Sequence, residues 1–141
     1  MRHLSRLVVL ALFLGVATTA NATVKYLKWD HPHGGSRGNL AAIDLSARKV
    51  LWEARPSKSI NFVQETTIGI LVGTDDGEVI LLRASDGNVI WKTVLEKKRE
   101  IKDFHSETVD GFFIGSGDRF YWLVDRSGKV TMHCADECVP E

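Results

Sequence analysis

Short apolar runs and glycine-containing turns alternate along most of this chain, and no segment after the first 22 residues has the three- and four-residue spacing of an amphipathic helix. In the middle of the chain, β-rich runs at 60–64, 68–72, 79–83 and 89–93 are separated by short turns. Gly77 and Gly87 lie in two of these turns, where a tight hairpin needs positive φ. The pattern predicts four consecutive antiparallel strands in meander order.

The same unit recurs before and after this segment. A later set of strands is expected at 101–106, 112–114, 120–124 and 130–133, with Gly128 in its last turn. An earlier set shows its last two strands clearly, and residues 26–29 supply a candidate third. When the three units are aligned, Trp52, Trp91 and Met132 occupy the same position, at intervals of about 40 residues. A repeat of that length made of short strands is typical of one β-propeller blade.

The fold class predicted is therefore all-β, a partial β-propeller of two to three four-stranded antiparallel meander blades over residues 35–133. A closed ring has at least four blades and needs about 160 residues, more than the 141 of this chain. Three readings of such an arc stay open: its own tails shield its edges, other chains complete it, or it is the truncated product of a longer gene. An open arc exposes a blade face and strand edges, so a protein partner or self-association is expected.

Two of the units resemble the repeats of the pyrroloquinoline-quinone (PQQ)-like β-propellers. The residues that carry the resemblance form a β run, a turn and a closing tryptophan, at 42–44 with 49–52 and at 73–77 with 86–91. That family includes quinoprotein dehydrogenases and a non-catalytic scaffold of the bacterial outer-membrane assembly machinery. The resemblance implies that Trp52 and Trp91 dock neighbouring blades. The third unit departs from it, with Met132 in the tryptophan position and a turn one residue shorter.

Residues 1–22 have the features of a cleaved signal peptide. Arg2 and Arg6 precede an apolar stretch of about eleven residues, and Ala20-Asn21-Ala22 forms a small-x-small cleavage site before Thr23. A membrane-spanning helix needs about 20 residues, so no stable membrane span is expected. The predicted location is the periplasm or the extracellular space if the source is bacterial, and the secretory lumen if it is eukaryotic. The domains predicted are the signal peptide (1–22), a lead-in strand or loop (23–34), the repeats (35–133) and a tail (134–141).

Cys134 and Cys138 are the two cysteines of the chain, and both lie near its end. In an oxidising compartment they are expected to form a small disulfide worth about 2 kcal/mol, enough to hold a tail in place; two free thiols are the alternative. His31, His33 and His133 could join them in a metal site, but the spacing matches no zinc pattern. No metal is therefore predicted.

Charge and motifs exclude several functions. Eighteen basic residues balance eighteen acidic ones, which is not the composition of a protein with a nucleic-acid partner. No nucleophile, zinc-protease or paired-carboxylate motif is present, so no catalytic residue is predicted. Gly115-Ser116-Gly117 is expected to be a hairpin turn rather than a nucleotide loop, and residues 96–103 a solvated connection between blades. The aspartates nearest the repeat motifs lie in or beside turns, where Asp is favoured: Asp44, Asp75, Asp76 and Asp86.

Two classes of function follow. The first is an exported non-enzymatic binding or scaffolding module that acts through protein contacts in the cell envelope. The second is a remnant or subunit of a PQQ-dependent quinoprotein oxidoreductase, and a lumenal sensor-type propeller domain is a further alternative. In the family, PQQ and its calcium ion lie on the axis of a complete ring, so no cofactor is expected in a partial one. Binding by a blade face or a sheet edge needs no ring, which favours the first class.

Overall fold

The computed structural model describes residues 23–29, 38–135 and 138–140, which form strands and turns. No helix in this part of the chain is long and apolar enough to cross a membrane. The predicted signal peptide and the two histidines at 31 and 33 lie outside the described residues. The all-β architecture predicted from the repeats is confirmed.

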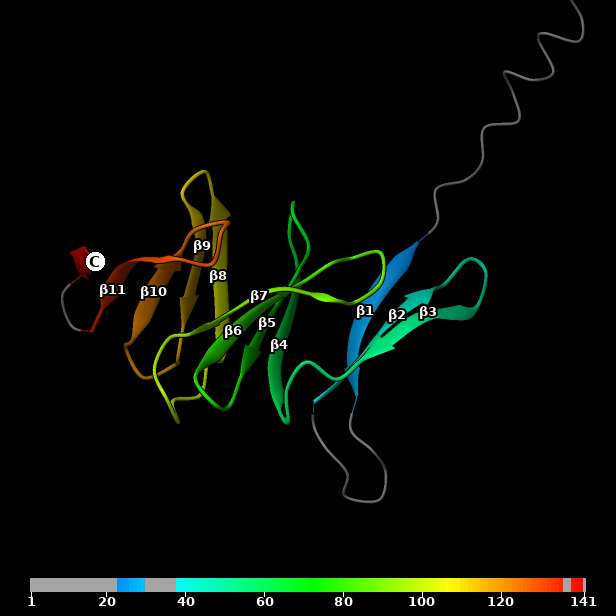
Figure 1. The fold of residues 1–141 in the computed structure, drawn as a ribbon, viewed down its shortest axis with the longest axis horizontal. Helices are drawn as coiled ribbons and strands as arrows, with labels where there is room; N and C mark the ends of the chain where they lie inside the picture. Colours follow the sequence, from blue (N-terminus) through cyan, green and yellow to red (C-terminus); the bar gives the residue numbers. More distant parts are fainter. Residues whose placement is uncertain (1–22, 30–37, 136–137, 141) are drawn as a thin grey trace, which may run out of the picture.

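The strands form three antiparallel sheets, named here blades 1, 2 and 3 (Figure 1). Blade 1 consists of β1 (Val24–Trp29), β2 (Asn39–Asp44) and β3 (Lys49–Ala54). Blade 2 consists of β4 (Ile60–Glu65), β5 (Ile70–Thr74), β6 (Glu78–Leu82) and β7 (Val89–Val94). Blade 3 consists of β8 (Asp103–Thr108), β9 (Gly111–Gly115), β10 (Tyr121–Val124), β11 (Val130–Cys134) and β12 (Cys138–Pro140).

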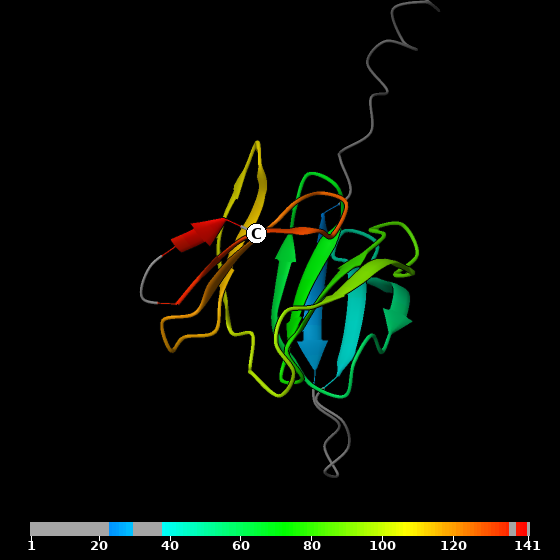
Figure 2. The same ribbon diagram turned by 60° about the vertical axis from the view of Figure 1, so that its left-hand side comes forward.

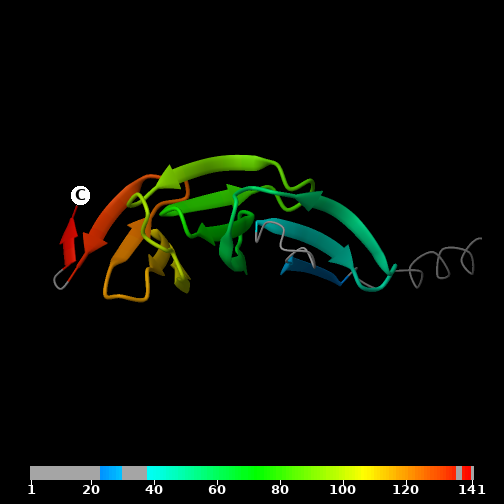
Figure 3. The ribbon, with the colours of Figure 1, turned by 90° about the horizontal axis from the view of Figure 1, so that it is seen from below.

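The blades follow one another in a curved row, with blade 2 between the other two (Figures 1 and 2). Figure 3 shows this arc from below: β3, β7 and β11 run along its convex side, and β1, β4 and β8 lie at its concave side. Within each blade, strands that are neighbours in sequence are also neighbours in the sheet. The arrangement is an open partial propeller, as the repeats predicted.

Within the described residues, only blade 2 has the four strands expected of each unit. Blade 3 has a fifth, because the segment predicted as a tail forms β12 and pairs with β11. Blade 1 has three among the described residues, and its first strand, β1, comes from the predicted lead-in segment and pairs with β2. A three-residue strand such as β12 is too short to show alternation in the sequence.

Among the described residues, blade 1 has no inner strand paired to β1, and the side chain of Lys28 reaches β4 of blade 2 instead. In blade 2 the inner strand places Phe62 over Gly73, where an added Cβ would lie 2.2 Å from the ring. In blade 3 His105 lies over Gly115 in the same way, at 2.8 Å. The register puts Lys28 at the position of these two glycines. Its ammonium group donates to a backbone carbonyl of β4 at 3.3 Å, so a side chain of β1 fills part of the place that an inner strand takes in the other blades.

Blade 2 is buried on both faces. Successive residues of a strand point to opposite faces, and the buried residues 70–72 of β5 and 79–82 of β6 are all apolar. Leu71, Val79 and Leu81 join the core shared with blade 3. The core shared with blade 1 takes the residues between them: Ile70, Val72, Ile80 and Leu82. The continuous apolar runs of this segment are therefore explained by packing between two other sheets.

A one-residue slip in pairing occurs at the same place in the outer hairpin of each blade. The last pairs before the slips are Ala42 with Trp52, Leu81 with Trp91, and Leu123 with Met132. Such a β-bulge bends and twists the outer strand. The structure therefore aligns Met132 with the two tryptophans, as the repeat spacing does.

Trp52 and Trp91 each bind the turn of the next blade. The indole N–H of Trp52 donates to the carbonyl of Ala84 at 2.8 Å, and its ring lies against Gly87, where an added Cβ would be 2.5 Å from a ring carbon. Trp91 repeats the contact one blade later. Its indole N–H donates to the carbonyl of Arg126, in the turn before Gly128, at 2.9 Å. A Cβ on Gly128 would lie 2.7 Å from the Trp91 ring. Both tryptophans therefore lie at blade junctions.

The turn glycines have two roles at once. Gly77, Gly87 and Gly128 have φ values of 82°, 76° and 89°, which side chains with a Cβ adopt at a cost. Each is also a point of close approach. A Cβ on Gly77 would lie 1.6 Å from the carbonyl oxygen of Glu96, in the segment that leads to blade 3. Hairpin geometry alone therefore does not account for these residues.

Gly128→Ala should destabilise the fold more than Gly117→Ala. Both glycines have left-handed φ, 89° and 81°, so both substitutions carry backbone strain of about 1 kcal/mol. At Gly117 a Cβ would meet nothing nearer than 3.5 Å, whereas at Gly128 it meets the Trp91 ring. We expect an additional loss of about 1–3 kcal/mol in the free energy of unfolding for Gly128→Ala, measured by urea denaturation. Equal losses for the two variants would contradict the docking role of Trp91.

Candidate functional site

The face of blade 3 that turns away from blade 2 is the candidate functional site. In blade 2 the corresponding face carries Leu71, Val79 and Leu81, which are at most 1% exposed because blade 3 covers them. The register gives their counterparts as Phe113, Tyr121 and Leu123, with Met132 in the place of Trp91. These four side chains are partly exposed. Among the described residues, no further blade follows to cover them.

The residues on the opposite face of blade 3 confirm that this other face is the one that packs against blade 2. Phe112, Ile114, Trp122 and Val124 alternate along β9 and β10 with the residues of the open face, and all four are buried in the core with blade 2. Blade 3 therefore resembles blade 2 in having two apolar faces. We name the uncovered one the blade 3 open face: His105, Phe113, Tyr121, Leu123 and Met132.

Three rings of this face pack against one another. His105 lies 5.4 Å from both Phe113 and Tyr121 between ring centroids, and Phe113 and Tyr121 are stacked at 5.6 Å. Gly115 lies beneath them, and a Cβ there would be 2.8 Å from the imidazole of His105. These distances are in the range of favourable aromatic pairs. The face is thus a preformed aromatic surface whose rings hold one another in place.

The turn between β8 and β9, at the end of this face, resembles the β4–β5 turn through which blade 2 contacts blade 3. In blade 2 the backbone N–H of Thr67 donates to the carboxylate of Glu107 in blade 3, at 3.1 Å. A hydrogen bond from the Thr67 side chain is the main cause that lowers the pKa of Glu107, and this backbone bond lowers it further. The turn between β8 and β9 has the same internal hydrogen bonds, and its tip residue, Val109, is 91% exposed. Blade 3 therefore offers the same turn that blade 2 uses to bind its neighbour.

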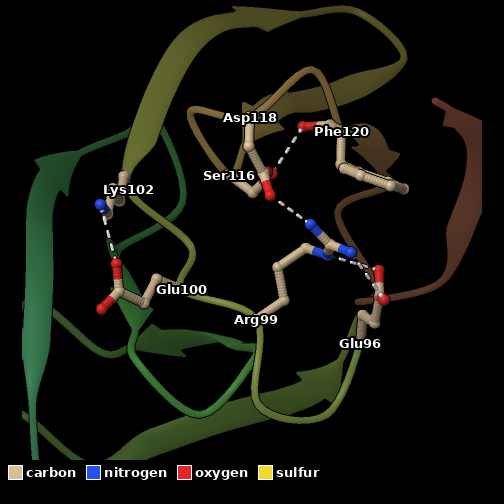
Figure 4. Close-up of polar contacts among 7 residues, drawn as sticks. All are labelled: Glu96, Arg99, Glu100, Lys102, Ser116, Asp118 and Phe120. Atoms are coloured by element: carbon tan, nitrogen blue, oxygen red, sulfur yellow. Dashed lines mark hydrogen bonds and ion pairs between the residues drawn. The ribbon is translucent and has the colours of Figure 1, made fainter. Parts of the chain in front are cut away.

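A polar cavity of about 450 Å³ lies at the connection between blades 2 and 3. It brings together the segment at 96–102 and the turn at 116–118, which are far apart in the sequence (Figure 4). Arg99 lies between the two. Its guanidinium donates to Glu96 at 2.7 and 3.1 Å and to Asp118, and it lies 3.6 Å from the centre of the Phe120 ring.

The charges of this cavity largely pair with one another. The Glu96 carboxylate is the main cause that raises the pKa of Arg99. A hydrogen bond from the Ser116 hydroxyl, with the charge of Arg99, lowers the pKa of Asp118. Lys102 pairs with Glu100 at 2.8 Å. We therefore interpret the cavity as a polar link that joins the connection to blade 3. The sequence contained no sign of this contact, because it depends on the spacing of the two blades.

The turn aspartates hold their own backbone. Asp44 accepts from the N–H of two residues that follow it, at 2.9 and 3.0 Å, and Asp86 accepts from Asn88 at 2.9 Å. That backbone hydrogen bond is the main cause that lowers the pKa of Asp86. Asp75 accepts from Ser59 at 2.5 Å, and the N–H of Asp76 donates to a threonine hydroxyl. Asp44 ends β2 and the other three lie in turns, so the structure does not gather the four carboxylates into one site.

The histidine and cysteine near the C-terminus lie in separate surroundings. His133 is stacked on Trp122 with 5.3 Å between centroids and an angle of 4°. Within the described residues there is no cluster of three or more side chains that could hold a metal ion. Cys134 is buried and disulfide-bonded, and the register of β11 and β12 places Cys138 directly opposite it. Cross-strand neighbours suit disulfide geometry, which supports the predicted Cys134–Cys138 bond.

Comparisons with known proteins identify the architecture. No protein-family model matches the chain, and no curated protein matches it. Among solved structures, it is similar to quinohemoprotein alcohol dehydrogenase from Comamonas testosteroni, with a TM-score of 0.57 and 18% identity over 67% of this chain. It is also similar to BamB from Moraxella catarrhalis, with a TM-score of 0.56 and 14% identity over 79% of this chain.

The matched regions make up 18% of the dehydrogenase chain and 39% of the BamB chain. Identities this low establish the fold alone. The structural neighbours are PQQ-like β-propellers, which is the resemblance that the repeats at 42–52 and 73–91 indicated. The chain therefore has the fold of a partial PQQ-like β-propeller.

Proposed function

We propose that this chain is an exported, non-enzymatic module that binds protein through the blade 3 open face. The observation that carries the proposal is that Phe113, Tyr121 and Leu123 occupy positions that a neighbouring sheet covers completely in blade 2. An apolar sheet face of this kind gains stability when another protein surface covers it. Aromatic residues and methionine are also enriched at the centres of protein interfaces.

The shape of the surface favours a protein over a small molecule. Small ligands bind in concave sites that enclose most of their surface, whereas this face is one side of an antiparallel sheet. The likeness to an alcohol dehydrogenase supplies the second candidate, an oxidoreductase subunit. A ligand at the centre of a propeller is held by residues from many blades, and this chain provides three sheets. The binding module is therefore the better supported function.

Two features support export. The N-terminal segment has the charge and apolar pattern of a signal peptide, and Cys134 is disulfide-bonded, as is usual in oxidising compartments. N-terminal sequencing of the protein recovered from the compartment outside the cytoplasm should therefore begin at Thr23. Recovery of the chain with Met1 retained would contradict cleavage.

A photo-reactive phenylalanine analogue at position 113 should form a covalent adduct with the bound protein in the source cells. The ring of Phe113 lies at the centre of the blade 3 open face, so the probe replaces one aromatic side chain with another. We expect a cross-linked product visible as a discrete mass increase on denaturing gels. Mass spectrometry of the product then gives the partner and the contact position.

The matched control is the same probe at Val94, which is exposed on the outer strand β7. It should give little or no adduct, because that position lies outside the open face. Equal yields at the two positions, or no adduct at position 113, would contradict binding through blade 3.

The oxidoreductase candidate has a spectroscopic test. Purified protein mixed with PQQ and Ca²⁺ and then dialysed should show no retained quinone absorbance and no dye-linked oxidation of alcohols or sugars. The physical reason is that the described residues contain no cluster of three or more carboxylate, histidine or cysteine side chains that could hold the calcium ion. Stoichiometric retention of the quinone would favour the enzyme instead.

A further inference from the structure

We infer that the partner of the blade 3 open face is a second copy of this chain, which docks through the outer face of its blade 1. The inference rests on the proposed function, namely that this face binds protein, and adds the identity of the partner. It comes from comparing the two free ends of the arc with the two junctions inside it.

Blade 1 also has an uncovered face. Tyr26 packs toward blade 2 beside Trp52, so the alternation of β1 places Lys25 and Leu27 on the opposite face. Leu27 is 48% exposed, whereas its register counterparts in blades 2 and 3, Val72 and Ile114, are fully buried. A preceding blade covers those counterparts. Leu27 therefore stands at a docking position without a described neighbour.

The internal junctions use a tryptophan and a glycine, and both are replaced at the free ends. Met132 stands in the tryptophan position of blade 3. In the β2–β3 turn of blade 1, Arg48 stands two residues before Val50, as Gly87 stands two residues before Val89. Arg48 has φ of 53°, so this turn keeps the left-handed residue of the receiving turns while carrying a side chain.

The two replacements fit each other. A Cβ at Gly87 would lie 2.5 Å from the Trp52 ring, so the turn that contains Arg48 cannot receive a tryptophan in that geometry. Methionine is unbranched and flexible and can pack beside a side chain there. An unrelated partner for blade 3 would give no reason for Arg48 in blade 1 of the same chain. A second copy gives one, because Met132 of one copy then meets Arg48 of the other.

A cation on the blade 1 face also suits the aromatic blade 3 open face. Lys25 occupies the position of Ile70 in blade 2 and Phe112 in blade 3, and in blade 3 that position faces Trp91 of the preceding blade at 6.5 Å. In the docked pair, Lys25 of one copy therefore faces Met132 of the other, which lies on the same face as the rings of Phe113 and Tyr121. A cation near exposed aromatic faces is attracted by them.

Two copies joined in this way also form a closed ring of blades. Each chain contributes three sheets, so the pair has six, within the usual four to eight blades of a propeller. Each copy uses its blade 1 face once and its blade 3 face once, and the two contacts are related by a two-fold axis. The assembly therefore leaves no blade face uncovered.

The test is the mass of the purified protein by sedimentation over a micromolar concentration series. The wild-type chain should have twice the monomer mass. Met132→Trp should raise the dimer dissociation constant at least about tenfold, because the ring meets the Cβ of Arg48. Combining it with Arg48→Gly should restore the dimer, because the internal tryptophan–glycine pair is then reproduced at the junction between copies.

Two further variants keep the test decisive. Leu27→Glu places a charge at an exposed position of the blade 1 face and should also give monomers. This variant replaces Met132→Trp in the test if near-ultraviolet circular dichroism shows that Met132→Trp does not fold. Val94→Glu, exposed on β7, is the control and should leave the dimer unchanged. A monomeric wild type, a dimer that neither Met132→Trp nor Leu27→Glu weakens, or no rescue by Arg48→Gly would overturn the inference. A cross-link from position 113 to a different protein would overturn it while the proposed binding function stands.

Discussion

The whole structure depends on the covering of one sheet by the next. An isolated antiparallel sheet of three or four strands with two apolar faces is not stable in water, because at least one face stays hydrated. Blade 2 avoids this with Leu71 and Leu81 against one neighbour and Val72 and Ile80 against the other. The tryptophan–glycine contacts then set how far apart and at what rotation neighbouring sheets sit. Blade-to-blade packing is thus the source of stability, and at the two ends of the described arc it leaves apolar faces uncovered.

The repeats were readable from the sequence because they are local. Turn glycines, β-branched runs and the regular spacing of Trp52, Trp91 and Met132 each lie within one hairpin, and they predict strands, meander order and blade length. The strands of blades 2 and 3 agree with these predictions to within a few residues. The lead-in segment was less clear, because β1 alternates Lys25 and Lys28 with apolar residues and its neighbour β2 is distant in sequence.

The candidate site could not be predicted in the same way. Alternation shows that Phe112 and Phe113 lie on opposite faces of β9, but only the order of the blades shows which of them is covered. The same holds for Arg48, which in the sequence is an ordinary charged turn residue. Its meaning appears only when its turn is superposed, through the register, on the two turns that receive tryptophans. Contacts between blades join residues that are far apart in the sequence, and they produce no periodic sequence pattern from which they could be predicted.

The repeated bulges have a consequence for solubility. The outer strands β3 and β7 are sheet edges, and they expose Val50, Leu51, Val89 and Ile90. A straight, apolar edge of this kind is a template for strand addition by other chains and for the growth of fibrillar aggregates. The bulge beside each tryptophan twists the strand just where these residues lie, so the edge presents a bent and interrupted hydrogen-bonding row. In blade 3, where β11 carries the same bulge, β12 occupies the edge itself. The bulge that accompanies each docking position thereby also makes the outer edge of the sheet a poor template for pairing with another chain.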